Sequence, residues 1–301
     1  MATQVSKTTF QSTYKDDYAD SDNYYRVLFN SGKALQAREL TQLQTMIQKQ
    51  IERFGSNIFV DGGVVNGTGF TVNNGYEFIK LADNQLPSAT GSELLNVEFT
   101  DEDGIKFKIV QVVTAATTGD ADTIYVNYTD RRSGTSSTTP VRTAADRILY
   151  HPTTASLNMR SRDVSDVSGA GTKVSIGRGS FFVQGVFVYA QEQSLIVSYY
   201  SPVPNLVIGF KIDEKIITSS DKTSLYDNQG AVPNVAAPGA DRYQIKLSLI
   251  DRANIVGAEN FVYLFKLTRG KISDEARTDN SYNKINDLMA LRTKEESGNY
   301  I

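Results

Sequence analysis

Apolar residues recur at helical spacing in one long internal segment, from Lys33 to Phe54. Most of them fall on one stripe of a helix, because they lie three, four or five positions apart: Leu35, Leu40, Leu43, Met46, Ile47, Ile51 and Phe54. We expect Ser31 to cap this helix and Gly55 to end it in a left-handed conformation. A second helical pattern over Asn280–Glu296 predicts a C-terminal helix, with Ser297-Gly298-Asn299 as its stop.

Most of the chain between Ile58 and Thr268 follows a strand pattern instead. Four segments alternate between apolar and polar residues and are rich in β-branched and aromatic side chains: 105–113, 123–128, 243–249 and 261–267. Asn73-Asn74-Gly75 predicts a tight turn, so 70–72 and 76–81 are expected to pair as a hairpin. Regular turn signals without intervening helices favour antiparallel sheets. The predicted fold is therefore mainly β with a few helices: antiparallel β sandwich or barrel-like domains, one long N-terminal amphipathic helix and one C-terminal helix.

Changes in pattern divide the chain into four expected parts. These are an N-terminal arm with the amphipathic helix, a β-rich domain, a second β-rich segment, and a C-terminal helix with its tail, at residues 1–55, 56–200, 201–275 and 276–301. Residues 55–65 and 179–188 share a pattern of Gly-Ser, aromatic, Val, a polar residue and Gly. The glycine after the polar residue is expected to form a bulge or a close backbone approach within a strand.

The face of the long helix opposite its apolar stripe is rich in glutamine rather than in charged residues: Gln36, Gln42, Gln44, Gln48 and Gln50. Two interpretations remain open. The helix packs its apolar stripe on its own domain and leaves the polar face in solvent. Alternatively, the amide face, or the seam of Leu40, Leu43, Ile47, Gln50 and Phe54, contacts another chain.

Composition restricts the chemistry that this chain can perform. Without cysteine it has no disulfide, no thiolate nucleophile and no cysteine-bearing metal site, and its only histidine is His151. The formal net charge of -3 provides no basic field, so we expect no nucleic-acid partner. No apolar stretch approaches the roughly 20 residues of a membrane-spanning helix, so no stable membrane insertion is expected.

The candidate catalytic and ligand motifs are weak. Gly169–Lys173 lacks the Gly-Lys-Ser/Thr end of a phosphate loop, and we interpret it as a β turn. Asp16, Asp17, Asp20 and Asp22 offer oxygen ligands for calcium, but they lack the spacing of an EF-hand and are interpreted as a solvated arm. His151 precedes a proline and is expected to be a surface or hydrogen-bonded loop histidine. We therefore predict no catalytic residue, no metal site and no cofactor.

One stretch resembles a known family more closely than these motifs resemble any catalytic site. Residues 25–55, YRVLFNSGKALQARELTQLQTMIQKQIERFG, together with Ile58–Val65, resemble the N-terminal signature of a family of tailed-phage virion proteins. That family occurs especially in T-even-like cyanophages and other marine phages. Residues 179–188 and 288–300 resemble further family features. Ser31 and Lys33 depart from the proline and arginine that family members tend to have, which affects only the start of the helix.

The resemblance implies a structural component of a bacteriophage tail or baseplate, an adaptor that joins the particle to neighbouring subunits or tail fibres. It implies a virion location after synthesis in the host cytoplasm, homo-oligomer formation and no enzymatic activity. Since relatives continue past the segment ending at Tyr300, we expect this chain to be the attachment module alone, with residues 1–22 lying on another subunit. The expected assembly interface comprises Tyr25, Arg26, Phe29, Asn30, Leu35, Gln36, Arg38, Glu39, Leu40, Gln42, Leu43, Gln44, Ile47, Gln50, Ile51, Arg53 and Phe54.

Two other functions remain open. A receptor- or glycan-binding tail fibre protein would use tyrosines such as Tyr189, Tyr199 and Tyr200 as stacking platforms, although such residues also pack across strands. A polysaccharide-degrading tail enzyme would need a pair of carboxylates about 5 to 9.5 Å apart, a separation that the sequence alone does not give.

Overall fold

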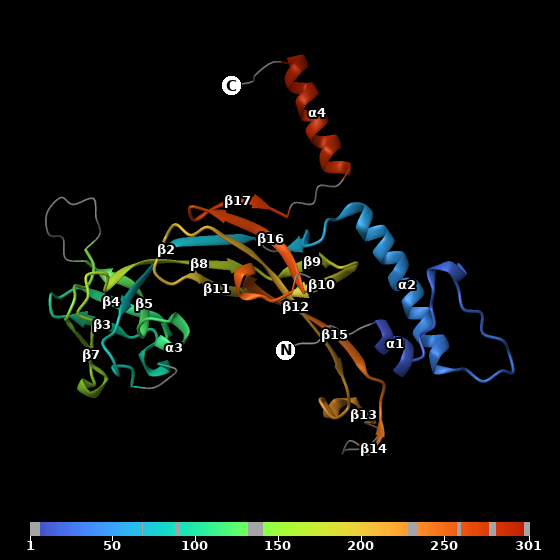
Figure 1. Cartoon of the computed structure of the whole chain (residues 1–301), viewed down its shortest axis with the longest axis horizontal. Helices are drawn as coiled ribbons and strands as arrows, with labels where there is room; N and C mark the ends of the chain where they lie inside the picture. The colour runs from blue at the N-terminus through green and yellow to red at the C-terminus, as the bar shows by residue number, and fades with distance from the viewer. Residues whose placement is uncertain are drawn as a thin grey trace.

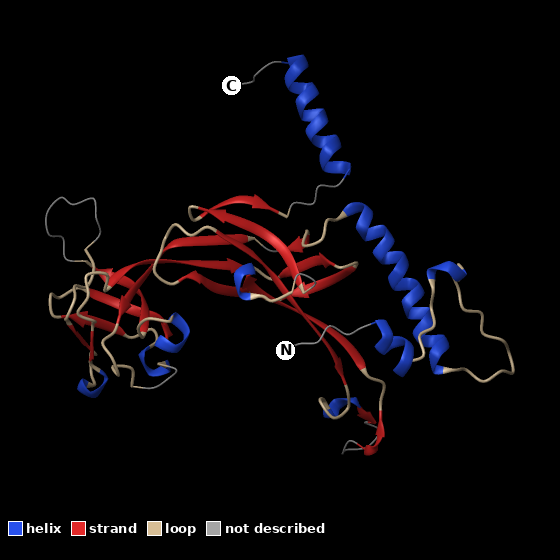
Figure 2. Cartoon of the chain, in the orientation of Figure 1, coloured by secondary structure: helices blue, strands red, loops and turns tan. Residues whose placement is uncertain are grey.

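The chain folds into an elongated, mainly β structure that carries helices at one side and at one end (Figure 1). The computed structural model describes residues 7–67, 69–87, 91–131, 141–227, 234–257, 260–276 and 281–297. Four α-helices occur among these residues: α1 (Lys7–Thr13), α2 (Ala37–Ile58), α3 (Ala115–Thr118) and α4 (Ser281–Ser297). Figure 2 shows that α2 and α4 extend from the edge of the strand-rich body. No helix of the described residues combines the length and the apolar composition required to cross a membrane.

Every strand pairing in the described chain is antiparallel, which confirms the predicted fold class. The largest sheet has eight strands in the order β11-β8-β2-β5-β4-β3-β6-β7. Their bounds are β2 Phe70–Lys80, β3 Glu98–Asp101, β4 Lys106–Val113, β5 Thr123–Asp130, β6 Ile148–Tyr150, β7 Met159–Arg160, β8 Ser168–Ile176 and β11 Gln193–Ser198.

Three smaller sheets complete the fold. A four-stranded sheet has the order β15-β12-β16-β17, from β12 (Leu206–Ile217), β15 (Arg242–Asp251), β16 (Phe261–Thr268) and β17 (Lys271–Glu275). A three-stranded sheet joins β1 (Val64–Gly67), β9 (Gly179–Val183) and β10 (Val186–Ala190) in the order β1-β9-β10. The remaining sheet pairs β13 (Tyr226–Asp227) with β14 (Asn234–Pro238). The four segments expected to be strands from their alternation correspond to β4, β5, β15 and β16.

Apolar side chains gather into two main cores. The first joins β8, β9 and β10 to β12, β15 and β16, with Phe181 and Phe210 at its centre, 4.7 Å apart and edge to face. It therefore spans both sides of the boundary expected near residue 200. The second core lies among β2 to β7, around Phe99 and Phe107. A small cluster of Tyr76, Phe78 and Tyr125 sits on the sheet that the two cores share.

The predicted hairpin at Asn73-Asn74-Gly75 does not form. Residues 70–80 are the single strand β2, and the extra residues produce a shift of register against β8 between Asn73 and Tyr76. The strand continues because β8 provides a pairing partner on both sides of the shift. Asn74 also donates from Nδ2 to the carbonyl oxygen of Gly270, 2.7 Å away. Asn73-Asn74-Gly75, a sequence that favours a turn, therefore forms a bulge within a continuous strand.

The C-terminal helix occurs within one residue of its predicted bounds, as α4. Gly298 and Asn299 of its expected stop lie outside the described residues. Figure 1 shows α4 standing apart from the body, and its described apolar side chains are exposed: Leu288, Met289 and Leu291.

Candidate functional site

Helix α2 begins four residues later than the pattern predicted. The residue before it is Gln36, whose backbone is extended, and its N–H donates to Oε2 of Glu39 at 3.0 Å. The Gln36 side chain accepts in return from the Glu39 backbone, so the two residues form a reciprocal cap. Ser31 does not cap the helix, because Gly32 directly after it has a φ of 80°, which a right-handed helix does not allow.

The end of α2 also differs from the prediction. Gly55 was expected to stop the helix in a left-handed conformation, but the helix continues through it to Ile58. The reason for a glycine is close packing: a β-carbon at Gly55 would lie 2.4 Å from Cε2 of the Phe182 ring. Gly55 therefore lets the helix approach strand β9.

The two sequence segments that share a pattern meet at this junction. Phe59, just after α2, packs on Phe182 and Phe187 with ring centres 5.9 and 5.6 Å apart. Gln184 donates from its backbone N–H to Asp61 at 2.7 Å. Neither segment contains the expected mid-strand bulge after its polar residue, because both Asp61-Gly62 and Gln184-Gly185 are turns. The alternative, a close backbone approach, does occur at Gly62, where a β-carbon would lie 2.2 Å from the carbonyl oxygen of Tyr263. The shared pattern therefore marks two turns that pack together.

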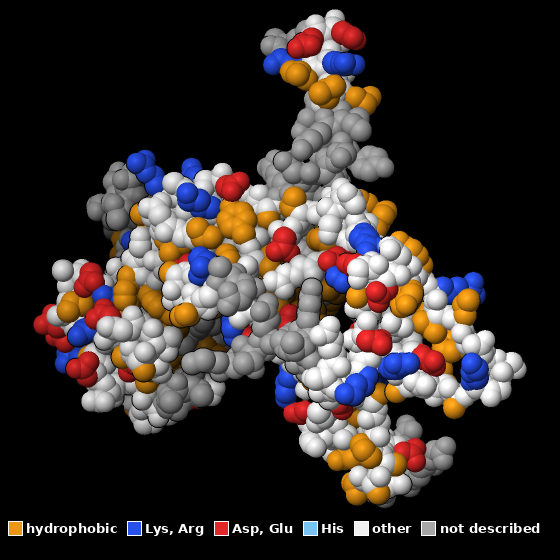
Figure 3. Space-filling view, turned by 45° about the vertical axis from the view of Figure 1, so that its right-hand side comes forward, with side chains coloured by type: hydrophobic (Ala, Val, Ile, Leu, Met, Phe, Trp, Pro, Cys, Tyr) orange, Lys and Arg blue, Asp and Glu red, His pale blue; other side chains and the backbone are white. Residues whose placement is uncertain are grey.

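Most of the apolar stripe of α2 faces solvent instead of the protein's own core. Leu40, Ile47, Ile51 and Phe54 are between 42% and 66% exposed, whereas Met46 is buried. Figure 3 shows apolar side chains along this side of the molecule. The interpretation in which the stripe packs on its own domain therefore holds only for Met46 and in part for Leu43, and it is wrong for the exposed members of the stripe. Unpartnered apolar surface of this kind is typical of an interaction site.

The polar side of α2 is held by the N-terminal arm. Asp16 is buried, and its Oδ2 accepts a hydrogen bond from the Thr45 hydroxyl at 2.5 Å. Three further contacts fasten the arm to the helix: Asp17 to Gln42 at 3.2 Å, Asp17 to Arg38 at 3.6 Å, and Asp20 to Arg53 at 3.0 Å. The prediction of a solvated arm is wrong for Asp16, which is buried, whereas Asp17, Asp20 and Asp22 remain exposed even though Asp17 and Asp20 find donors along α2. The contacts lie within one chain and give no support to docking of the arm on another subunit.

The beginning of the arm contacts strand β15. Phe10 packs edge to face on Tyr243 with ring centres 5.3 Å apart, and the Tyr14 hydroxyl donates to Asp241 at 2.7 Å. That hydrogen bond raises the pKa of the Tyr14 phenol, because the carboxylate favours its protonated form. Burial and the nearby Glu214 raise the pKa of Tyr243 as well. Both phenols thus remain neutral donors at ordinary pH.

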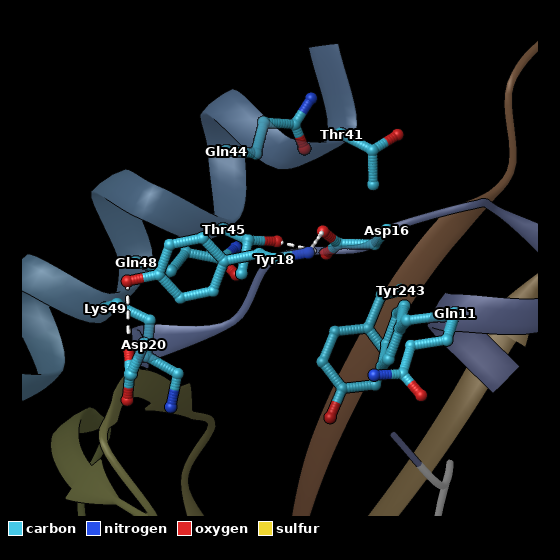
Figure 4. A pocket seen from close by; sticks show the side chains of 11 residues that line it. Gln11, Asp16, Tyr18, Asp20, Thr41, Gln44, Thr45, Gln48, Lys49 and Tyr243 are labelled. Atoms are coloured by element: carbon cyan, nitrogen blue, oxygen red, sulfur yellow. Dashed lines mark hydrogen bonds between the residues drawn. The ribbon is translucent and has the colours of Figure 1, made fainter. Parts of the chain in front are cut away.

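A cavity of about 460 Å³ lies between the arm, α2 and β15 (Figure 4). Figure 4 shows Asp16 and Thr45 directed toward each other, with Tyr243 across the cavity from the helix. Aromatic, amide, hydroxyl and charged groups line it: Phe10, Gln11, Asp16, Tyr18, Asp20, Thr41, Gln44, Thr45, Gln48, Lys49 and Tyr243. A second hollow of about 370 Å³ continues along α2 to Gly185 and Phe187 of the β9–β10 hairpin.

The residues predicted for an assembly interface divide into two groups. Exposed side chains are available for contact: Tyr25, Arg26, Phe29, Asn30, Leu35, Leu40, Gln44, Ile47, Gln50, Ile51 and Phe54, with Leu43 half-buried. The others already have partners within the chain: Gln36 and Glu39 in the cap, Arg38 and Gln42 on Asp17, and Arg53 on Asp20. Sequence reasoning missed the exposed Tyr24 and Leu28, which lie in the same stretch of sequence and could have been found from their apolar type.

The other sequence candidates have structural roles. Gly169–Lys173 lies within strand β8 and is not a turn. Tyr200 bonds to Thr123 through its hydroxyl and packs on Phe78, whereas Tyr189 is exposed. His151 accepts at Nδ1 from the backbone of Thr153 and Thr154, which confirms a hydrogen-bonded loop histidine. No group of three or more possible metal ligands occurs among the described residues.

A comparison with models of known families identifies the family of this chain. The family model of DUF4815, a domain of unknown function, matches residues 12–86 and 162–301, well over half of the sequence. The chain belongs to the DUF4815 family. The matched part of this DUF4815 protein includes α2, most of the arm and the β9–β10 hairpin, whereas the unmatched residues 87–161 contain β3 to β7. Searches of curated proteins and of solved structures give no match.

Proposed function

We propose that this DUF4815 protein is a structural component of a bacteriophage tail or baseplate, an adaptor that joins the particle to neighbouring subunits or tail fibres. The observation that carries the proposal is the outward apolar stripe of α2, which lies within the signature that resembles tailed-phage virion proteins. A particle component needs a surface that binds its neighbours without chemistry. The arm supports this role because it fastens the polar side of α2 and leaves the apolar side free.

The energetics agree with assembly by burial of the stripe. Apolar area removed from water contributes about 25 cal/mol per Å². Exposed amide groups beside the stripe, such as Gln44 and Gln50, form hydrogen bonds without the desolvation cost of full charges. A partner that covers this surface therefore gains free energy from apolar burial and from these hydrogen bonds.

The test is made in the phage that encodes the chain. Purified particles are analysed by mass spectrometry and by immunogold labelling, for the wild-type chain and for Ile47→Asp, with Gln48→Ala as a matched control on the same helix. We expect label at the tail or baseplate for the wild type and the control, and strong loss for Ile47→Asp. Since Ile47 is exposed, its replacement changes the stability of the free chain by only about 0.5 kcal/mol. A chain that is made in infected cells but absent from purified particles overturns the proposal.

The cavity beside α2 favours a second function, recognition of a glycan receptor. It presents the rings of Tyr18 and Tyr243 together with the amides of Gln44 and Gln48, a combination of apolar faces and hydrogen-bonding groups that suits a small polar ligand. Binding on a glycan array that is lost in Gln44→Ala supports this function. An array without signal above background counts against it.

A further inference from the structure

The apolar side chains exposed on α2 and on the residues beside it in the sequence add up to a large area. Ten large apolar side chains from the preceding segment, the helix and its end are each 37% to 73% exposed: Tyr24, Tyr25, Leu28, Phe29, Leu35, Leu40, Ile47, Ile51, Phe54 and Val60. At about 150 to 250 Å² for a large side chain, they expose on the order of 1,000 Å². The largest patch on a typical monomer is about 300 to 600 Å². A stable interface needs about 800 Å² from each partner, which this surface supplies.

The spacing on the helix specifies the shape of the partner. Leu40, Ile47 and Phe54 lie seven residues apart, and Leu43 and Gln50 occupy the intermediate positions of the same heptads. Helix α2 has 22 residues, about three heptads. A seven-residue repeat of this kind fits another α-helix, because it keeps one seam facing the partner along the whole length. The arm does not obstruct the seam, since it binds the side of α2 that carries Thr45.

Charge favours a second copy of this chain over an unrelated helix. In a symmetric pair, equivalent residues approach each other, so charged residues beside the seam would repel. With Leu40, Ile47 and Phe54 as one seam position and Leu43 and Gln50 as the other, the flanking positions carry Gln44, Ile51 and Ile58 on one side and Glu39, Met46 and Arg53 on the other. In a parallel pair the two sides face each other, so no two like charges meet across the seam. The charged residues of the helix have intrachain partners, as Arg38 does with Asp17, Arg53 with Asp20 and Lys49 with Glu52. Two copies therefore meet without an unpaired like-charge contact.

Gln50, the polar residue within the seam, determines whether the two helices pair parallel or antiparallel. In a parallel pair, Gln50 faces Gln50 of the other copy, and the two amides satisfy each other. In an antiparallel heptad pair, Gln50 faces Ile47 and loses hydrogen bonds to water without replacement. We propose that α2 pairs with α2 of a second copy of this chain, parallel and in register, along Leu40, Ile47 and Phe54. This inference names the first partner in the proposed particle role and rests on that role only for its biological setting.

The absence of cysteine in the native chain makes a direct experiment possible. Leu40→Cys, Ile47→Cys and Phe54→Cys are made singly in the 301-residue chain and oxidised at low concentration. A disulfide needs Cα atoms about 4.4 to 6.8 Å apart, so a parallel pair in register gives a covalent dimer at all three positions. Ser56→Cys is the matched control, because Ser56 is exposed on the opposite side of the helix. We expect Ser56→Cys to give no covalent dimer, although the chains still associate.

Sedimentation equilibrium of the cysteine-free chain measures the affinity independently. We expect a dimer whose dissociation constant rises at least about 100-fold in Ile47→Asp, because a central seam residue is replaced in both copies. Gln48→Ala is expected to leave the dissociation constant within about 3-fold of wild type.

Several results overturn the pairing. A chain that remains monomeric without crosslinks overturns it, and so does crosslinking at only one seam position, which indicates an antiparallel pair. A dimer that Ile47→Asp leaves unchanged also overturns it, because another surface such as α4 then forms the contact. The two proposals fail separately: a monomeric chain that is still found in particles refutes the pairing alone, and a dimer that is absent from particles refutes the particle role alone.

Discussion

Gly55 lies directly against the ring of Phe182, so that a β-carbon at residue 55 would sit 2.4 Å from the ring's Cε2 atom. This relationship fixes helix α2 to strand β9, and with it the direction in which the apolar stripe points. Gly55 lies within the helix and has no positive φ, so a glycine is needed there for close packing and not for a left-handed turn. Two segments more than 120 residues apart in sequence are joined by this contact.

The first prediction concerns Gly55→Ala. At an open helical site, alanine stabilises a helix by about 1 kcal/mol relative to glycine. Here we expect the opposite sign, a loss of about 1 to 3 kcal/mol, because the added methyl group overlaps the Phe182 ring. Urea unfolding measures the free energy. The matched control is Gly69→Ala, whose β-carbon meets nothing within 4 Å; a stabilised Gly55→Ala variant contradicts the contact.

The same junction shows what the sequence pattern can and cannot predict. Alternation located β4, β5, β15 and β16 correctly, because burial of one sheet face imposes a period of two regardless of the partner. The amphipathic pattern of α2 located its apolar stripe but not what the stripe faces. That depends on contacts distant in sequence, such as Asp16 with Thr45 and Gly55 with Phe182. The turn expected at Asn73 failed for the same reason, since β8 pairs across it.

The second prediction concerns the arm. Asp16→Ala removes a buried carboxylate that accepts from Thr45 and from the backbone N–H of Tyr18. Hydrogen bonds to a charged group contribute about 1.5 to 3 kcal/mol. We expect the arm to detach more often, with roughly tenfold faster proteolysis between residues 14 and 23, while the β body stays folded. Asp22→Ala is the control, because its side chain is exposed. Equal cleavage rates in the two variants would show that Asp16 does not hold the arm.

The third prediction concerns pH and the side chain of Lys80. Its ammonium is nearly buried between Asp120 at 2.7 Å and Asp166 at 2.6 Å, and it lies 4.2 Å from the centre of the Tyr200 ring. The hydrogen bond from Lys80 lowers the pKa of both carboxyl groups below their usual value of 3.8. The two carboxylates in turn raise the pKa of Lys80 above 10.5, although burial opposes them.

The lowered carboxyl pKa values affect stability at low pH, and the raised lysine pKa affects it at high pH. A lowered carboxyl pKa contributes stability above about pH 4 that is lost as pH falls through the folded-state pKa. A raised lysine pKa contributes stability that is complete below its unfolded value and is lost as pH rises through the folded-state pKa. Lys80→Met should therefore lose about 1 to 3 kcal/mol at pH 7 and show a flatter decline between pH 4 and 2. Thermal melts between pH 7 and pH 2 measure both effects; Lys222→Met, at an exposed position, is the control.

The last prediction concerns how the two cores unfold. Tyr125 comes from strand β5, within the part that the family model leaves unmatched, and is fully buried on the sheet between the cores. Its ring stacks on Tyr76 with centres 4.6 Å apart, and its hydroxyl donates to the carbonyl oxygen of Tyr199 at 3.2 Å. This residue therefore connects residues 87–161 to the matched body of the fold.

We expect the wild-type chain to melt in one calorimetric transition, with equal calorimetric and van't Hoff enthalpies for the β body. Tyr125→Ala should cost about 3 to 5 kcal/mol and separate the melt into two transitions, because the cavity weakens the contact between the cores more than either core itself. Tyr125→Phe keeps the ring and should cost only about 1 kcal/mol, the value of one hydrogen bond. Tyr150→Ala, at a partly exposed strand end, is the control and should leave one transition. A single transition in Tyr125→Ala would show that the remaining strand pairing of β2 with β5 and β8 is enough to couple the two cores.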